Sequence, residues 1–396
     1  MIKIPITHTA ILVCMWILVI ALSPIYSETV ISGVAETKGQ GRISDDSYYM
    51  QAEQFANIRM RSTIGEYGEF HSVVQLIVSS NTENEFCSQA ELERLYLSLV
   101  IERFDIKLGL QRLPFGYGFA FRPLDMFTQP SVLYPEARPK GVLSSLITVY
   151  PRDELSFSLF CGQQSEDVIQ DTRDPVFYGL ALTQHHSVFS AQFLYALSVS
   201  RDETQPTIGS GGFSTKVDSL IGIILEALYT HDYSSPFEEG SVDHNIQVTA
   251  GFDYSWMSGK LYLVTQYCYS SAGYLDSSDS ISSLYADPLW ADLPFTERKP
   301  VIVSNDFYRR HYLYFSILWM PDSYTQGSLS VITALEDGSF LPQVQIEREW
   351  LQGCSLGMTT RMPLDMYTIS SGHYGELGST NLGFLIESTF FLKVRF

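Results

Sequence analysis

The chain has 396 residues, of which 45% are hydrophobic, 13% are aromatic and only 17% are charged. Its formal net charge of −19 at pH 7 argues against nucleic acid as a partner, because a nucleic-acid surface requires a basic patch. The composition fits strands that are apolar on one face and loops that are polar, although a soluble all-β enzyme could share it.

Residues 1–27 have the features of a secretory signal peptide. Lys3 lies near the start, an apolar run covers residues 10–22, and the small Ser27 stands at a plausible cleavage point. A membrane anchor is the alternative, but the run falls short of the roughly 20 residues that a spanning helix needs. We therefore expect a signal peptide over residues 1–27 and a single domain over residues 28–396. No later segment suits a membrane helix, so a mature chain that spans a membrane must do so as a closed barrel.

Short segments of alternating polarity follow one another along the rest of the chain. The clearest is a hairpin over residues 92–111, which turns at Glu102 and Arg103. Its apolar side chains share one face, as a period of two requires: Leu95, Leu97, Leu99, Ile101, Phe104, Ile106, Leu108 and Leu110. Similar segments cover residues 70–78, 155–159, 246–254, 261–269, 313–317, 329–335 and 344–346. Their number favours one all-β domain.

A long connection rich in aromatic residues, Gly and Pro follows this hairpin, over residues 112–140. The pattern around it reads Gly109-x-Gln111-Arg112, then Gly116-x-Gly118, then Arg122-Pro123-x-Asp125-x-Phe127. Over this stretch the chain resembles several large outer-membrane porins, including alginate-export-like and phosphate-selective-like groups. The resemblance implies an inward-folded loop that narrows the lumen, with these residues at the constriction: Arg112, Phe115, Tyr117, Phe119, Arg122 and Asp125. The alternative is an aromatic-rich surface loop.

The lengths of the connections indicate how the strands are arranged. Short turns are expected at 102–103, 151–154, 185–186, 257–260 and 351–354, and long loops at 81–90, 112–140, 163–173, 271–305 and 363–379. Bacterial barrels have short periplasmic turns and longer outer loops. Strand directions counted from the two ends agree only if a further strand covers residues 211–216, before a tight turn at 217–219. The total becomes about 18 strands, with 16 as the alternative, because bacterial barrels require an even number.

The apolar stripes also predict which charged side chains face the lumen. Six basic side chains lie on the water-facing side of the early strands and the last one: Arg59, Arg61, Arg94, Lys107, Lys393 and Arg395. Four acids face the lumen from later strands: Glu226, Asp253, Glu347 and Glu349. We expect a basic wall opposite an acidic wall, with a transverse field that orients polar solutes. The alternative is that these residues only keep the lumen wet.

One catalytic pattern occurs, because residues 353–357 have the G-x-S-x-G spacing of a nucleophile elbow around Ser355. That motif requires a strand-to-helix turn, whereas this one lies between two amphipathic strands. His185 and His186 fall in a predicted turn without a Cys or acid at ligand spacing. We expect no enzymatic activity, no cofactor and no metal. The dispersed cysteines leave disulfide pairing open: Cys87, Cys161, Cys268 and Cys354.

The last eleven residues alternate in polarity and end in Phe396. Such an ending resembles the carboxy-terminal signal that the barrel-assembly machinery recognises, with these apolar positions: Phe390, Leu392, Val394 and Phe396. The alternative is the final strand of a soluble sheet.

These features together predict a transmembrane antiparallel up-and-down β-barrel in the outer membrane. It would act as a passive diffusion channel for small hydrophilic solutes or ions. A surface-exposed antigen or adhesin without conduction is one alternative, and an outer-membrane barrel hydrolase is another. The expected partners are outer-membrane lipid, the barrel-assembly machinery and the solutes themselves, and the chain could be a monomer or a homotrimer.

Overall fold

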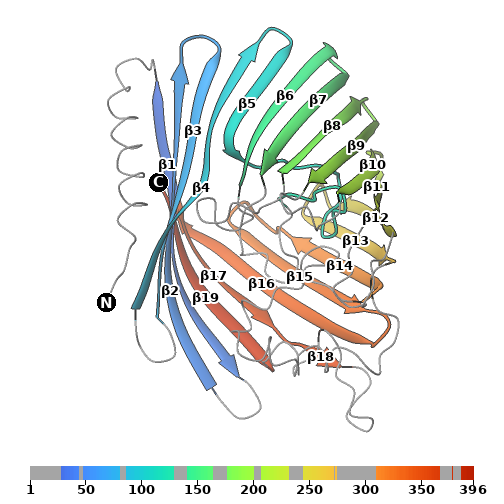
Figure 1. The fold of residues 1–396 in the computed structure, drawn as a ribbon. Coiled ribbons are helices and arrows are strands. Elements are labelled where there is room, and N and C mark those ends of the chain that lie inside the picture. The colour runs from blue at the N-terminus through green and yellow to red at the C-terminus, as the bar shows by residue number, and fades with distance from the viewer. Residues whose placement is uncertain are drawn as a thin grey trace.

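The protein folds as a closed antiparallel barrel, in which the first strand pairs with the last (Figure 1). The computed structural model describes residues 28–43, 48–80, 86–128, 141–163, 176–199, 207–231, 244–271, 273, 309–365, 377 and 385–396. The expected signal peptide lies outside these residues. Within them, no helix is long and apolar enough to cross a membrane.

The wall of the barrel follows chain order, so each strand pairs with its neighbours in sequence. The two-residue β18 pairs only with β16, and the other 18 strands of the described chain form the closed wall. The strands are β1 (Thr29–Ile43), β2 (Tyr48–Ile64), β3 (Gly68–Ser80), β4 (Phe86–Ile101), β5 (Phe104–Gln111), β6 (Val142–Arg152), β7 (Leu155–Gln163), β8 (Val176–His185), β9 (Phe189–Val199), β10 (Ile208–Val217), β11 (Ile221–His231), β12 (His244–Trp256), β13 (Leu261–Ser270), β14 (His311–Trp319), β15 (Thr325–Ala334), β16 (Ser339–Leu351), β17 (Cys354–Arg361), β18 (Leu364–Asp365) and β19 (Ile386–Arg395).

The predicted strand count and the additional strand are confirmed. β10 covers the segment that carried the weakest alternation in the sequence, and it pairs along its length with β9 and β11. Gly211 and Gly212 weaken the apolar pattern of this strand, so only the direction of its neighbours revealed it.

One rim of the barrel carries the tight turns, including Glu102 to Arg103 and Gln352 to Gly353, and we call it the short-turn rim. The connection over residues 112–141 emerges at the opposite rim. One expected loop differs from the structure, because residues 86–90 of the predicted loop 81–90 belong to β4 and pair with residues 76–80 of β3. The polar residues there indicated a loop, but a strand whose inner face meets water can carry polar side chains without leaving the sheet.

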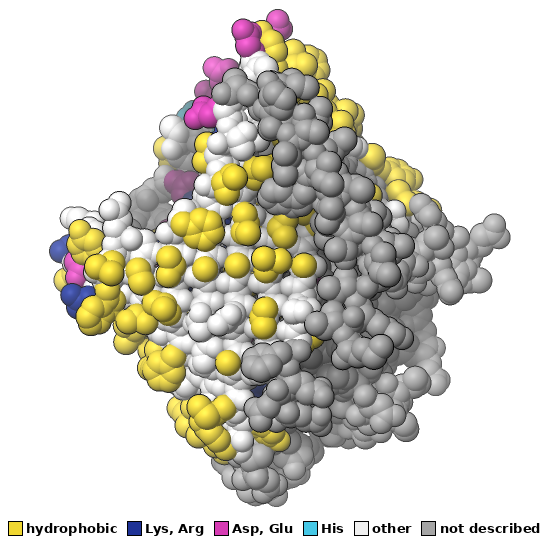
Figure 2. All heavy atoms as spheres, turned by 90° about the vertical axis from the view of Figure 1, so that its left-hand side faces the viewer, with side chains coloured by type: hydrophobic (Ala, Val, Ile, Leu, Met, Phe, Trp, Pro, Cys, Tyr) yellow, Lys and Arg dark blue, Asp and Glu magenta, His cyan; other side chains and the backbone are white. Residues whose placement is uncertain are grey.

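The outer surface of the barrel is apolar. Large hydrophobic side chains that alternate along the strands are solvent-exposed, including Leu108 on β5, Ile223 on β11 and Phe390 on β19. Figure 2 shows rows of hydrophobic side chains across one such face, with charged side chains at its edges. In the predicted hairpin, Leu97 pairs with Leu108 and Leu99 with Ile106, which confirms its register. An apolar exterior around a polar interior is the surface expected of a barrel that lies in lipid.

The barrel closes at the carboxyl end of the chain. The Gly33 N–H donates to the Phe396 carbonyl at 2.8 Å, and the Phe396 N–H donates to the Gly33 carbonyl at 3.1 Å. The Phe396 ring occupies the space that a side chain at residue 33 would need, since a Cβ there would lie 2.4 Å from the ring. Gly33 therefore accommodates the terminal ring, and the paired backbone extends the β1–β19 seam to the last residue.

Deletion of Phe396 should weaken this seam. Two backbone hydrogen bonds are lost, at about 1 kcal/mol each, and one rim of the seam is left unpaired. We expect the folded, fast-migrating form to convert to the unfolded form at a lower temperature in heat-modifiability gels. Phe396→Leu keeps both backbone bonds and serves as the control for loss of the ring. Equal melting of the deletion variant and the wild type would contradict this role of the terminal residue.

Candidate functional site

The described part of the connection after β5, residues 112–128, packs against the inner face of the barrel, and we call it the inner segment. Phe115 and Phe127 contact Phe160 on β7, with ring centroids 5.0 and 5.7 Å apart. Phe127 also stacks on Phe177 of β8 at 4.1 Å. Apolar contacts between aromatic rings thus fix the inner segment to β7 and β8.

A single carboxylate on β11 accepts hydrogen bonds from the middle of the inner segment. Glu226 Oε1 accepts from the backbone N–H of Gly118 at 2.6 Å, from the N–H of Tyr117, and from the Ser214 hydroxyl at 2.9 Å. The Glu226 side chain is fully buried. One carboxylate oxygen therefore fixes two consecutive backbone N–H groups of the inner segment to the wall.

Two glycines allow this approach. Gly116 has a φ of +83°, and a Cβ there would lie 2.6 Å from Glu226 Oε1. A Cβ on Gly118 would lie 2.0 Å from the carbonyl oxygen of Phe121. Gly116 is therefore explained by the close approach of the backbone to the carboxylate, and Gly118 by the tight turn toward Phe121.

Gln266 on β13 holds the next turn of the inner segment. Its Oε1 accepts from the N–H groups of Ala120 and Phe121 at 2.9 and 3.0 Å, and its Nε2 donates to the Phe121 carbonyl at 2.6 Å. Gln192 on β9 accepts from the Gly116 N–H at 2.7 Å. The sequence analysis missed Gln192, Ser214 and Gln266, because nothing in a strand pattern identifies which polar residue meets a loop far away in the chain.

The end of the inner segment forms a local turn around Asp125. Its carboxylate is 1% exposed and accepts from the Thr128 N–H at 3.2 Å and the Thr128 hydroxyl at 2.9 Å. Burial raises the pKa of Asp125 to about 6, against the opposing effects of Thr128 and Arg122.

Phe119, in the middle of the inner segment, packs in an edge-to-face arrangement with Tyr262 on β13, with ring centroids 6.4 Å apart.

The start of the inner segment is tied to β4 through Glu93, another residue that the sequence analysis missed. Arg112 Nη2 lies 2.9 Å from Glu93 Oε1, and Arg94 Nη2 lies 3.2 Å from the same oxygen. Asn57 and Gln75 donate to Glu93 Oε2 at 3.1 and 2.8 Å. The β3–β4 ladder shifts register next to Glu93, and such a β-bulge allows Glu93 and Arg94 to point to the same side of the sheet.

The other basic side chains of the expected basic wall also lie close to polar partners. Arg61 pairs with Glu69, and Lys107 Nζ lies 2.9 Å from Asp105. Arg59 instead donates to the neutral Asn57 side chain at 3.0 Å and is solvent-exposed. Arg59 thus keeps a charge that its hydrogen-bond partner does not neutralise.

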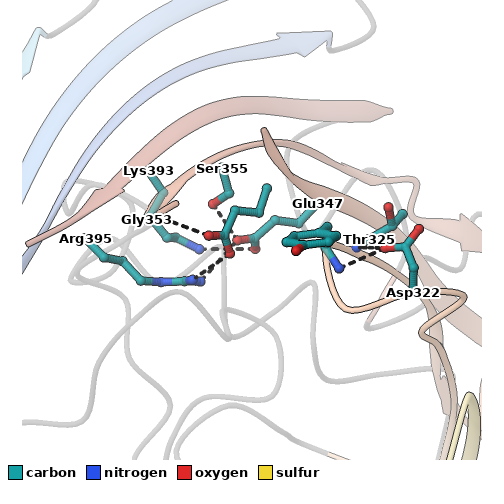
Figure 3. A network of polar contacts seen from close by, with 9 residues as sticks. Asp322, Thr325, Glu347, Gly353, Ser355, Lys393 and Arg395 are labelled. Carbon is teal, nitrogen blue, oxygen red and sulfur yellow. Dashed lines mark hydrogen bonds and ion pairs between the residues drawn. The ribbon is translucent and has the colours of Figure 1, made fainter. Parts of the chain in front are cut away.

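Two of the acids expected on an opposite wall lie next to the basic residues of β19 instead (Figure 3). Glu347 lies 3.2 Å from Lys393 and 3.5 Å from Arg395, and Glu349 lies 3.6 Å from Arg395. The strand order explains the difference, because β16 is separated from β19 only by β17. Of the remaining acids, Glu226 is buried under the inner segment, and Asp253 accepts from the Tyr262 hydroxyl at 3.0 Å.

The serine of the G-x-S-x-G pattern is buried in the barrel wall and hydrogen-bonded to a neighbouring strand. Ser355 is the second residue of β17, is 2% exposed and donates to Glu347 Oε1 at 2.7 Å. It does not stand on a strand-to-helix turn, so the context of a nucleophile elbow is missing. Among the described residues, no group of three or more His, Cys, Asp or Glu side chains could hold a metal ion. The thiols of Cys87, Cys161, Cys268 and Cys354 are free.

An antiparallel barrel of 18 strands, apolar outside and polar inside, is the architecture of a transmembrane β-barrel protein. Solved structures share this fold: Pseudomonas aeruginosa OccK9 (OpdG) matches with a TM-score of 0.60 and 12% identity, over 94% of this chain and 99% of that one. The outer membrane protein opdK from the same organism matches with a TM-score of 0.58 and 9% identity, over 94% and 99%. OccK2 (OpdF) of P. aeruginosa, solved in complex with glucuronate, matches with a TM-score of 0.57 and 10% identity, over 94% and 98%. No protein-family model and no curated protein matches the chain.

Replacement of Glu226 by Ala should release the inner segment from β11. The Gly118 N–H loses its acceptor, at about 1–3 kcal/mol for a donor left without a partner, and the Tyr117 N–H keeps only the Ser214 hydroxyl at 3.1 Å. We expect their amide hydrogens to exchange at least about tenfold faster in hydrogen-exchange measurements on the folded barrel. Glu36→Ala, which removes a carboxylate from β1 far from these contacts, is the control. Unchanged protection of both amides in Glu226→Ala would show that the carboxylate does not hold the segment.

Proposed function

We propose that the protein is an outer-membrane porin, a passive and water-filled channel for small hydrophilic solutes or ions. The observation that carries this proposal is the fixed position of the inner segment, held against one side of a closed, polar-lined barrel by Glu226 and Gln266. An 18-stranded barrel is too wide for wall side chains alone to fill, so the remaining interior is expected to hold water. The shared fold with OccK9, opdK and OccK2 supports this function.

The inner segment would narrow the channel. Its backbone is anchored to the wall on one side, so the half-buried Arg122 would line the passage on the other, whereas Arg112 is paired with Glu93 and the Tyr117 hydroxyl is buried. Phe115 and Phe119 would support the segment from beneath, and Asp125 would hold its turn. A constriction anchored at several strands keeps its shape without a solute bound, which suits selection by size and polarity.

The outer-membrane location rests on the apolar exterior and on the fold. In this proposal the short-turn rim faces the periplasm, residues 1–27 direct export, and the ending at Phe396 is recognised by the barrel-assembly machinery. Membrane lipid would contact the outward apolar side chains. The motif around Gly116 and Arg122 supports membership in the alginate-export-like or phosphate-selective-like groups, and the chain could act as a monomer or a homotrimer.

Conductance in planar bilayers tests the proposal. Purified, heat-modifiable protein should produce stepwise and long-lived current increments, because a closed barrel with a fixed constriction conducts without gating energy. Protein that has been heat-unfolded before addition is the control. A silent bilayer from folded protein would exclude the channel and leave a surface antigen or adhesin, whereas cleavage of lipids or esters would indicate a barrel hydrolase.

The charges of the basic wall should contribute unequally to ion selectivity. Arg59→Ala should shift the reversal potential in a salt gradient toward cation selectivity, because Arg59 has a neutral hydrogen-bond partner. Arg94→Ala should shift it less, because Arg94 lies beside Glu93. The two variants are matched controls for each other, since each removes one Arg from the inner wall, from β2 and from β4, with β3 between them. Equal shifts would show that local pairing does not decide the contribution of these charges.

A further inference from the structure

A polar cavity lies on the inner wall, on the arc that residues 116–121 of the inner segment do not hydrogen-bond. Its volume is about 610 Å³, within the range of small-molecule sites, and its lining comes from β1, β2, β3, β4, β16, β17 and β19. The hydrogen bonds of residues 116–121 instead go to β9, β10, β11 and β13, on the other arc of the barrel (Figure 1). The inner segment reaches the edge of the cavity arc at the Arg112–Glu93 pair on β4. A solute that passes the segment would therefore meet this cavity across the lumen.

The cavity is rich in neutral hydrogen-bonding groups. Five glutamines contribute to its lining, and Gln343 and Gln345 lie side by side on β16 with the hydroxyls of Thr359 and Thr389 on the neighbouring strands β17 and β19. Gln345 pairs in register with Thr359, and Thr359 with Thr389, so their side chains form a continuous row of amide and hydroxyl groups. Each amide carries both a donor and an acceptor, which matches the hydroxyl groups of a polyol.

Each basic side chain of the cavity lies beside an acid, and for Arg361 and Lys393 that acid lies outside the lining. The lining includes three acids, Glu36, Glu53 and Glu91, and three bases, Lys38, Arg361 and Lys393. Lys38 lies 3.4 Å from Glu53, Arg361 lies 3.6 Å from Glu387, and Lys393 lies 3.2 Å from Glu347. An anionic solute would have to separate these pairs to gain a cation, whereas a neutral solute would leave them intact.

Two aromatic rings complete the lining. Phe55 and Phe391 point inward from β2 and β19, and the ammonium groups of Lys38 and Lys393 lie 6.0 and 4.9 Å from their centroids. The two side chains are 8% and 7% exposed, so a sugar would touch the small exposed part of each ring while the neighbouring amides and hydroxyls bind its hydroxyls.

We propose that this cavity is a binding subsite for neutral sugars, which names the substrate class of the proposed channel and rests on that function. The amide row supplies the hydrogen bonds, the exposed parts of the two rings supply a small apolar contact, and the paired charges disfavour anionic solutes. The subsite lies on the wall and not on the inner segment, so binding of the sugar does not require the segment to move.

Maltotriose as a neutral probe and glucuronate as an anionic probe test the subsite through interruptions of the single-channel current. Maltotriose should interrupt the current in a concentration-dependent manner, and glucuronate at the same concentration should do so at least about tenfold more weakly. The double variant Gln343→Ala/Gln345→Ala should weaken the maltotriose effect about tenfold, because two neutral hydrogen-bonding groups are lost. Gln54→Ala, which removes an exposed amide of β2 outside the cavity lining, is the matched control and should leave the effect unchanged.

Saturation-transfer NMR with maltotriose and the purified protein separates failure of the subsite from failure of the channel. Binding that the double variant abolishes would support the subsite even if the bilayer were silent, and the silent bilayer would overturn only the channel. A conducting protein without maltotriose binding would overturn the subsite alone. Stronger interruption by glucuronate than by maltotriose, or an unchanged effect in the double variant, would also overturn it.

Discussion

Closure of the backbone hydrogen-bond ladder is the constraint on which the rest of this structure depends. A sheet edge in lipid would leave a row of N–H and C=O groups without partners, at several kcal/mol for each group, so every strand needs two neighbours. The seam between β1 and β19 provides the last set of pairs and extends to Gly33 and Phe396. Once the seam is closed, the register of each strand decides which side chains meet lipid and which face the interior, because a shift of one residue would exchange the two faces.

The second constraint is that many charged side chains lie close together on one inner surface. Glu93 receives Arg94, Arg112, Asn57 and Gln75, and Glu347 receives Lys393, Arg395 and Ser355. These clusters bring together residues from neighbouring strands, so charge is balanced within small patches rather than between opposite walls. A field across the whole lumen is weakened by such local pairing, and the exposed Arg59 retains more influence than its paired neighbours.

Alternation, strand direction and the even strand number of bacterial barrels together predicted the fold. The hairpin that turns at Glu102 follows from the side-chain period, and the strand around Phe213 follows from the directions of its neighbours. The partners within the site could not be predicted in the same way. Glu226 was expected in the lumen, but its role as an acceptor for the Gly118 N–H depends on how a loop folds more than 100 residues away in the chain.

The β-bulge next to Glu93 shows why register is the limit of sequence analysis here. Leu95, Leu97 and Leu99 alternate with a period of two. Leu92 is out of step with them, because the extra residue of the bulge lies between Leu92 and Arg94. A simple period of two cannot place both Leu92 and Arg94 correctly, so Glu93 was overlooked as the partner of Arg112.

The inner segment covers one arc of the inner wall, so the two arcs differ in how buried their side chains are. On the arc from β7 to β14, the segment excludes water and the wall residues are buried, as for Glu226 and Phe177. On the arc from β16 through β19 to β4, the amides and ion pairs of the wall border an open cavity. The buried half needs Gly116, since a Cβ there would press on Glu226, and Gly118, since a Cβ there would press on the Phe121 carbonyl and open the turn. Gly116 and Gly118 set how far the inner segment extends from its own wall into the lumen. The width of the open space in front of the cavity therefore depends on two residues that do not line the cavity.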